Sequence, residues 1–401
     1  LDYNTVFYTN IVLSSTVYVI IFLIAPLLAA LFKSPEITSV IRVMSLGMPI
    51  GALSGVHSSM ISKNLAFKKF FFSTLSGSLL SAVVGLSMVL QGCGVWALVG
   101  QNLVSTIANT IVLLLIVRWR PKRMFSKERF KSLFSYGWKL TASNLMGTFF
   151  AQMKGYAIGL RYTTADLAYY NRGEGVPGIL YNNISSSINT VLFPALSKLQ
   201  DDKIAIRRAL SKTMQTASFV LMPGLLGLAA VSDNFVQIVY TSKWIAVVPF
   251  MQVICLMNCF DLLGAANIQA LKAVGRADTL LKLEVYKKPL MVSILVICMF
   301  ISPLAIAIGQ FFYSLIALVI NAYPNRKYID YPLKKQFLDI SKSFYSAVLM
   351  AFIVYFIGKL SFNIYLLLIF QILVGVAVYV LLSRKFNKVV FQEVLALVKH
   401  R

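Results

Sequence analysis

Charged residues, and acidic residues above all, are scarce in this chain of 401 residues. Only 13% of the residues are charged, about half the share usual in a soluble protein, and 14 acidic residues stand against 38 basic ones. Apolar residues make up 58% of the chain, and the mean hydropathy is +0.76. A soluble domain of this composition could not cover its surface with polar groups, so a soluble globular protein is excluded.

The sequence also lacks the motifs of several chemistries. Its four cysteines form no CxxC pair and have no Cys/His spacing typical of a metal site. Cys255 and Cys259 lie one helical turn apart in an apolar run and are interpreted as small buried side chains. No GxxxxGK[ST] motif occurs, and the loops are too short for a soluble catalytic domain. We therefore expect no enzymatic activity, no metal and no cofactor.

Long apolar runs are what the chain does have. A membrane-spanning helix needs about 20 mostly apolar residues, whereas barrel strands show alternating segments of about 10. The runs are continuous, so the sequence predicts an all-α, polytopic helical membrane protein. The twelve spans expected from these runs lie at about 6–31, 38–61, 71–90, 94–117, 134–160, 165–195, 210–231, 246–271, 280–301, 303–322, 340–358 and 363–383.

The basic residues predict how these spans are oriented. Alternate connections, together with the C-terminal tail, carry 29 Lys and Arg residues, whereas the other connections carry only 4. Because cytoplasmic loops are enriched in Lys and Arg, the basic set is expected inside. Residue 1 and the C-terminus would both be cytoplasmic. Membrane topology also explains the net charge of +24 better than binding to nucleic acid does.

An internal repeat indicates two lobes. The spans of 6–117 and those of 210–322 have the same layout and orientation at an offset of about 208 residues. We predict an N-terminal lobe at 1–117, a basic cytoplasmic linker at 118–133, a C-terminal lobe at 134–322, and two extra spans with a tail at 323–401. Counterparts of the spans at 134–195 would precede residue 1. We therefore expect the chain to lack about two helices at its N-terminal end.

Several short stretches resemble a known family. The chain is similar to Wzx-type polysaccharide flippases of the MOP transporter superfamily, and the similarity covers almost its whole length. The stretches that carry the resemblance are 1–7 (LDYNTVF), 119–121 (WRP), 167–172 (LAYYNR), 188–202 (INTVLFPALSKLQDD), 222–228 (MPGLLGL), 242–244 (SKW), 248–249 (VP), 271–276 (LKAVGR) and 281–288 (LKLEVYKK).

The resemblance implies a fold, a substrate and partners. Members have two six-helix lobes and two further C-terminal helices. They lie in the bacterial inner (plasma) membrane and flip a polyprenyl-diphosphate-linked oligosaccharide from its cytoplasmic to its outer leaflet by alternating access, for O-antigen, capsule or exopolysaccharide synthesis. The implied partners are the lipid-linked glycan, membrane lipid, a polysaccharide polymerase and a chain-length protein, while coupling to H⁺ or Na⁺ is left open. The alternatives are another MOP exporter, of lipid II or of drugs, and a membrane polymerase or ligase, which usually needs a larger outer loop.

Charges inside the spans mark the candidate substrate cavity. A charged side chain at the centre of a span costs about 2.5–3.5 kcal/mol, so it needs a partner or a hydrated cavity. Arg172 and Glu174 either form a self-neutralising pair or line that cavity. Pro177 and the surrounding glycines indicate a break in the helix there. Asp261 lies near the middle of its span, where it either contacts substrate or pairs within the lobe.

Four further residues complete the set of candidates. Lys154 and Arg42 lie near the outer ends of their spans, where either side chain could instead extend to the membrane surface. Relatives often carry an acidic residue at the position of Lys154, which puts a cation-coupling role there in doubt. Tyr170 and Asn182 belong to a span rich in hydroxyl and amide groups. Such groups suit sugar ligands, although they could equally form hydrogen bonds between helices.

Overall fold

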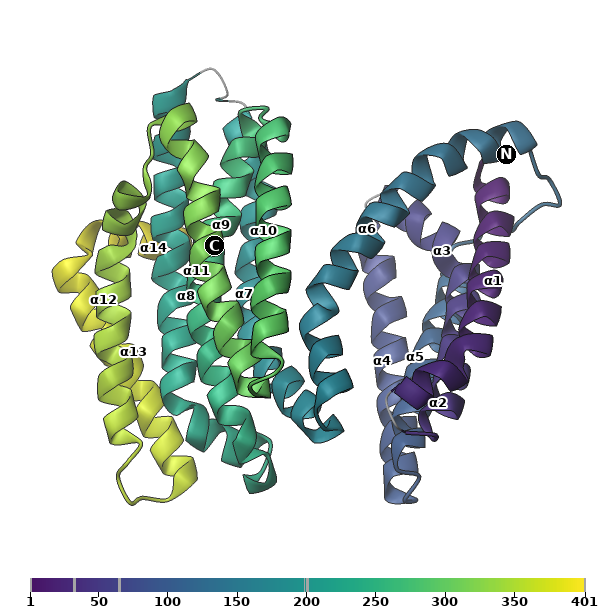
Figure 1. Ribbon diagram of the computed structural model, residues 1–401, viewed down its shortest axis with the longest axis horizontal. Coiled ribbons are helices and arrows are strands. Elements are labelled where there is room, and N and C mark those ends of the chain that lie inside the picture. Colours follow the sequence, from purple (N-terminus) through teal and green to yellow (C-terminus); the bar gives the residue numbers. More distant parts are fainter. Residues whose placement is uncertain (1, 32–33, 64–65, 198, 200–201, 400–401) are drawn as a thin grey trace. The chain divides into compact units, whose positions relative to one another are not determined.

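The structure is a computed structural model that describes residues 2–31, 34–63, 66–197, 199 and 202–399. Every regular element in these ranges is a helix (Figure 1). The predicted all-α class is therefore confirmed. The chain divides into two compact units, residues 1–151 and 152–401.

The first unit contains five helices and most of a sixth. Its helices are α1 (Asp2–Leu31), α2 (Ile37–Ser45), α3 (Gly47–Lys63), α4 (Phe67–Leu90), α5 (Val95–Ile116) and α6 (Lys127–Arg161). Because α6 begins at Lys127, the second half of the predicted linker is helical, and the division between the units falls within α6. The predicted span at 38–61 is two helices that meet at Leu46, where Pro49 has no N–H group for the helical ladder.

The second unit contains eight α-helices and one 3₁₀-helix in its described part. They are α7 (Thr164–Ser197), α8 (Lys203–Val239), η1 (Ser242–Val247), α9 (Val248–Ala273), α10 (Ala277–Cys298), α11 (Pro303–Ile329), α12 (Leu333–Ile357), α13 (Ile364–Phe386) and α14 (Lys388–Lys399). The amphipathic α14 lies in the predicted tail and packs against α8 and α13.

Every predicted span corresponds to helical structure. Within the described ranges, nine segments are long and apolar enough to cross a membrane. The predicted spans at 134–160, 165–195 and 280–301 are the helices α6, α7 and α10, which are long enough but more polar. In α7 this polarity comes from amides and hydroxyls, and in α10 from the charged first turns.

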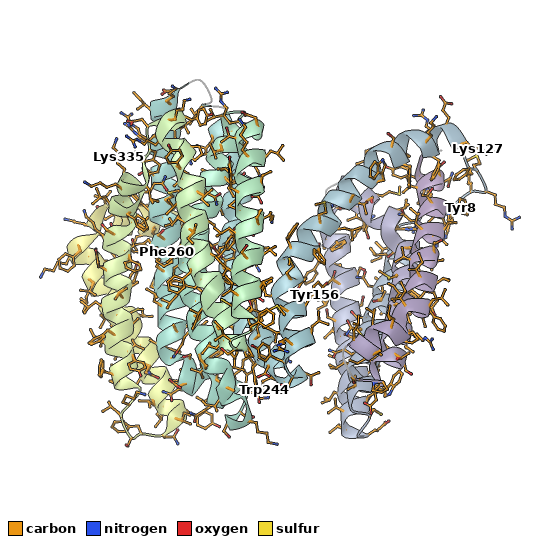
Figure 2. All side chains as sticks on the ribbon, viewed as in Figure 1. Tyr8, Lys127, Tyr156, Trp244, Phe260 and Lys335 are labelled. Atoms are coloured by element: carbon orange, nitrogen blue, oxygen red, sulfur yellow. The ribbon has the colours of Figure 1, made fainter. Side chains whose placement is uncertain are left out.

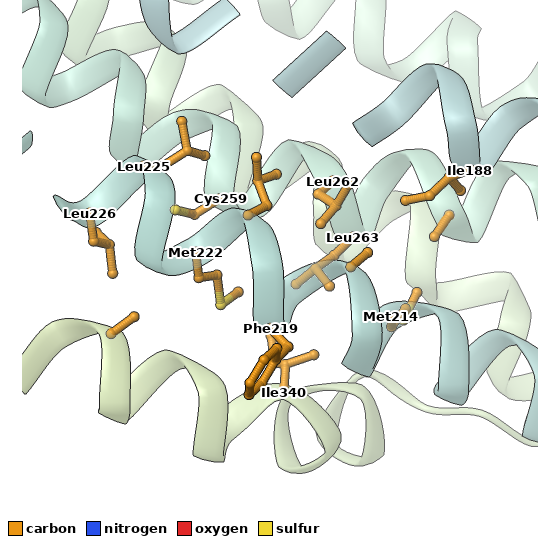
Figure 3. Close-up of a cluster of buried hydrophobic side chains, with 14 of the residues drawn as sticks. Ile188, Met214, Phe219, Met222, Leu225, Leu226, Cys259, Leu262, Leu263 and Ile340 are labelled. Carbon is orange, nitrogen blue, oxygen red and sulfur yellow. The ribbon is translucent and has the colours of Figure 1, made fainter. Parts of the chain in front are cut away.

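Buried apolar side chains hold the second unit together. Met222 and Leu225 of α8 pack with Cys259 and Leu262 of α9 in a cluster that also includes residues of α7 and α12 (Figure 3). Cys255 and Cys259 are free and buried, which agrees with their interpretation as small core side chains. This core fixes α9 against its neighbours and so fixes the position of Asp261.

Corresponding helices pack in the same order within each of the two units. In the first unit α1 packs on α3, α3 on α5, and α5 on α4; in the second, α8 packs on α9, α9 on α11, and α11 on α10. The offset of about 208 residues in the sequence relates these helices in the same order: α1 to α8, α3 to α9, α5 to α11 and α4 to α10. The shared order supports the proposal that they are counterparts, whereas the exact lobe boundaries stay a prediction.

The expected break in α7 is absent. Residues 164–197 form one continuous helix through Pro177. A Cβ atom on Gly173 would lie only 2.7 Å from Cβ of Phe250 and 3.1 Å from N of Met251. Gly173 therefore serves the close approach of α7 to α9, and the helix continues through Pro177 although this residue has no N–H group for the helical ladder.

Candidate functional site

A polar cavity of about 460 Å³ lies in the second unit, among the end of α6, α7 and α9. Apolar helices leave few sites for polar ligands, so a cavity lined by charges and amides stands out in this chain. Its polar lining consists of Lys154, Asn171, Glu174, Tyr181, Asn182, Asn258 and Asp261. Four of the seven residues predicted from sequence, Lys154, Glu174, Asn182 and Asp261, are thus brought together, and Tyr170 lies behind them.

Lys154 and Glu174 form an ion pair on the wall of the cavity. Nζ of Lys154 lies 2.8 Å from Oε1 of Glu174 and 5.6 Å from the centre of the buried Tyr170 ring. The lysine side chain is 19% exposed and the glutamate side chain 40%. The pairing predicted as one alternative, Arg172 with Glu174, is wrong, because residues two apart on a helix point to different sides. Lys154, on the neighbouring helix, reaches Glu174 instead.

Asp261, on α9, accepts a hydrogen bond from a neighbouring helix. The hydroxyl of Ser314, on α11, donates a hydrogen bond to its carboxylate. The buried Asn258 lies one helical turn before Asp261, and both residues line the cavity. A carboxylate held by one hydroxyl at mid-span keeps acceptor capacity free for a proton, a cation or a ligand hydroxyl.

The two predicted arginines lie elsewhere. The guanidinium of Arg172 is 5.9 Å from the centre of the Tyr240 ring and 5.8 Å from that of Trp244. In the first unit, Nε of Arg42 donates to the backbone oxygen of Phe22 at 3.1 Å, and its guanidinium lies 4.2 Å from the Phe22 ring centre. Both side chains therefore contact aromatic rings within about 6 Å, the range of a cation–π interaction.

The candidates from sequence left out three polar residues of the lining, Asn171, Tyr181 and Asn258. The signal for Asn258 was available, because it precedes Asp261 by three residues and so shares its helix face. The predicted arginines add no charge to the lining. In the described part of this wall one lysine faces two carboxylates, because Arg172 turns away toward aromatic rings.

Comparisons with known proteins agree on one family. Residues 1–249 match the family model described as "Polysaccharide biosynthesis protein". The chain is 24% identical over 303 residues to the lipopolysaccharide biosynthesis protein WzxC of Escherichia coli, covering 74% of this chain and 61% of WzxC. It is 24% identical to the succinoglycan biosynthesis transport protein ExoT of Rhizobium meliloti, covering 69% and 56%, respectively.

Two further likenesses add to this result. The teichuronic acid biosynthesis protein TuaB of Bacillus subtilis is 25% identical, over 69% of this chain and 57% of TuaB. The chain thus spans somewhat more than half the length of the curated relatives it matches. Among solved structures, the lipid II flippase MurJ in an inward closed conformation matches with a TM-score of 0.74 at 17% identity, over 96% of this chain and 83% of MurJ. That likeness concerns the fold.

Proposed function

Because the chain belongs to the family of polysaccharide biosynthesis proteins and is of the Wzx type within the MOP superfamily, we propose that it serves as a flippase. Its proposed substrate is a polyprenyl-diphosphate-linked oligosaccharide, which moves from the cytoplasmic to the outer leaflet by alternating access of two lobes. The observation that carries the proposal is the polar cavity among helices of a multi-pass membrane protein.

The lining suits both polar parts of such a substrate. Amides such as Asn182 and Asn258 donate and accept hydrogen bonds, as sugar hydroxyls require. Lys154 offers a cation to the diphosphate, and Glu174 neutralises that cation while the cavity is empty. Substrate binding would then exchange one anionic partner of Lys154 for another. The lysine charge therefore need not be desolvated alone at any step.

We assign the coupling of transport to Asp261. A carboxylate in a span is costly unless it is paired or reached by water, and Asp261 lines the cavity. Binding of H⁺ or Na⁺ there would neutralise the carboxylate and change its bond with Ser314, which joins α9 to α11. The polymerase and chain-length proteins that act on such glycans are the proposed partners.

Complementation tests this function. The gene that encodes this chain is introduced into a bacterial strain without its own flippase, and surface polysaccharide is measured. We expect restoration by the wild type, a loss of at least tenfold with Asp261→Asn, and normal activity with Asp278→Asn, a matched change at an exposed carboxylate of α10. Export of free drugs with no effect on surface glycan would contradict the proposal and favour the other MOP exporters.

A further inference from the structure

A second polar pocket, distant in the chain from the cavity lining, lies where α8 and α12 begin. Its volume is about 320 Å³. By the predicted orientation, these helix ends face the cytoplasm. The residues that give the pocket its chemistry are Arg207, Arg208 and Ser211 of α8, Tyr331 before α12, and Lys335 and Asp339 of α12.

The cations of this pocket have weak counterions. Nη1 of Arg207 lies 2.7 Å from Oδ2 of Asp330, and Nζ of Lys335 lies 3.4 Å from the same oxygen. The Asp330 side chain is 70% exposed, so water screens both contacts. Arg208 is exposed at the rim of the pocket. An anion that enters the pocket therefore meets Arg208 together with Arg207 and Lys335, two cations that share one water-screened carboxylate.

The carboxylate that lines the pocket, Asp339, accepts hydrogen bonds from two other lining residues. The hydroxyls of Ser211 and of the buried Tyr331 each donate to Oδ2 of Asp339 at 2.5 Å. Burial, together with the Asp339 carboxylate, raises the pKa of Tyr331, so its hydroxyl stays a donor. These bonds fix Asp339 in the wall, so the exposed Asp330 is the carboxylate with which an external anion would compete for Arg207 and Lys335.

An apolar groove adjoins the polar pocket along α12. The groove has a volume of about 500 Å³ and is lined mainly by apolar side chains, of which Phe260, Phe337, Phe344 and Tyr345 are aromatic. Leu338 lines both the pocket and the groove. Figure 2 shows Lys335 near one end of the second unit and Phe260 deeper toward its middle, so the groove extends inward from the end that bears the cations.

We propose that the pocket and the groove together bind an anionic glycerophospholipid of the membrane, apart from the transported substrate. The phosphate lies among Arg207, Arg208 and Lys335, and one acyl chain follows the groove past Leu338 to Phe260. Basic pockets between helices at the cytoplasmic side suit lipid phosphates. A free phosphate would use only the polar pocket, whereas the contiguous groove requires a ligand with an apolar chain.

Native mass spectrometry of the protein in neutral detergent tests this proposal. Phosphatidylglycerol is titrated against phosphatidylcholine with the same acyl chains, and in a separate arm against soluble glycerophosphoglycerol. We expect phosphatidylglycerol to be retained preferentially. Each charge removed by Arg207→Gln or Arg208→Gln should weaken its binding about fivefold, and the double variant about 25-fold.

Two matched controls separate binding from loss of folding. Lys342→Gln removes one charge from an exposed site on α12 and should leave lipid binding unchanged. Ser341→Trp fills the groove and should weaken binding of phosphatidylglycerol but not of glycerophosphoglycerol, whereas Val348→Trp, also exposed on α12, should change neither. Each variant is compared with the wild type by its thermal unfolding in lipid-free detergent.

Three results would overturn the proposal. The first is equal retention of phosphatidylglycerol and phosphatidylcholine, and the second is binding that the arginine changes leave intact. The third is displacement of phosphatidylglycerol by a polyprenyl-diphosphate glycan at equal concentration, which would assign the pocket to the transport substrate. Because the readout is lipid binding, failure of the proposed flippase activity would leave this inference standing.

Discussion

At the scale of single residues, the chemistry of the cavity depends on the ion pair between Lys154 and Glu174. A partly buried pair in direct contact shows coupling energies of about 0.5–3 kcal/mol in double-mutant cycles. We expect a cycle of Lys154→Met and Glu174→Gln, followed by thermal unfolding in detergent, to give at least about 1 kcal/mol. The same cycle on Arg172 and Glu174 should give coupling near zero, because Glu174 contacts Lys154. Equal coupling in both cycles would contradict the pairing seen in the structure.

Arg172 should matter less than its position in the sequence indicates. It contacts Tyr240 and Trp244 from an exposed site, where a cation–π interaction is worth about 0.5–1 kcal/mol. Arg172→Ala should therefore lower the free energy of unfolding by about that amount and reduce transport less than twofold. Uptake of labelled substrate into reconstituted vesicles measures the second effect. A loss of transport of tenfold or more at unchanged stability would indicate that Arg172 contacts the substrate.

The contact between α7 and α9 gives a prediction at the scale of elements. Gly173→Ala places a Cβ atom 2.7 Å from Cβ of Phe250, so the helices must separate. Overpacking of this kind costs about 1–3 kcal/mol. Gly175→Ala, two residues along the same helix, meets no heavy atom within 4 Å and should stabilise the helix by up to about 1 kcal/mol. Thermal unfolding of the two variants should shift in opposite directions, and parallel shifts would refute the close approach.

Element positions were predictable from the sequence because apolar runs and cation-rich loops reflect the physics of the bilayer. The positions of the more polar helices α6 and α7 were also predictable, because each lies between basic or turn-forming segments. What the sequence could not show was which side chains meet. The pair of Lys154 with Glu174 joins two helices, whereas the expected pair of Arg172 with Glu174 was the nearest in sequence. Likewise Gly173 suggested a loosened helix, and only the neighbouring Phe250 shows that it serves packing.

At the scale of the whole molecule, orientation in the membrane is the property that every functional statement depends on. The predicted linker at 118–133 carries seven of the cations, so its Ser126 should be cytoplasmic, whereas Ser361, between α12 and α13, should be outside. The native Cys93 lies in a predicted outer loop and supplies a positive control. Cys255 and Cys259 are buried and should not react.

An impermeant thiol reagent applied to intact cells tests this orientation. In a chain with Cys93→Ala and Cys298→Ala, labelling should appear with Ser361→Cys and be absent with Ser126→Cys until the membrane is opened. The electrostatic reason is that 29 Lys and Arg residues would otherwise have to face the outer side, against the positive-inside preference. Labelling of Ser126→Cys from outside would invert the topology. The basic pocket at Arg207 would then face the outer leaflet, and the proposed direction of transport would have to be reversed.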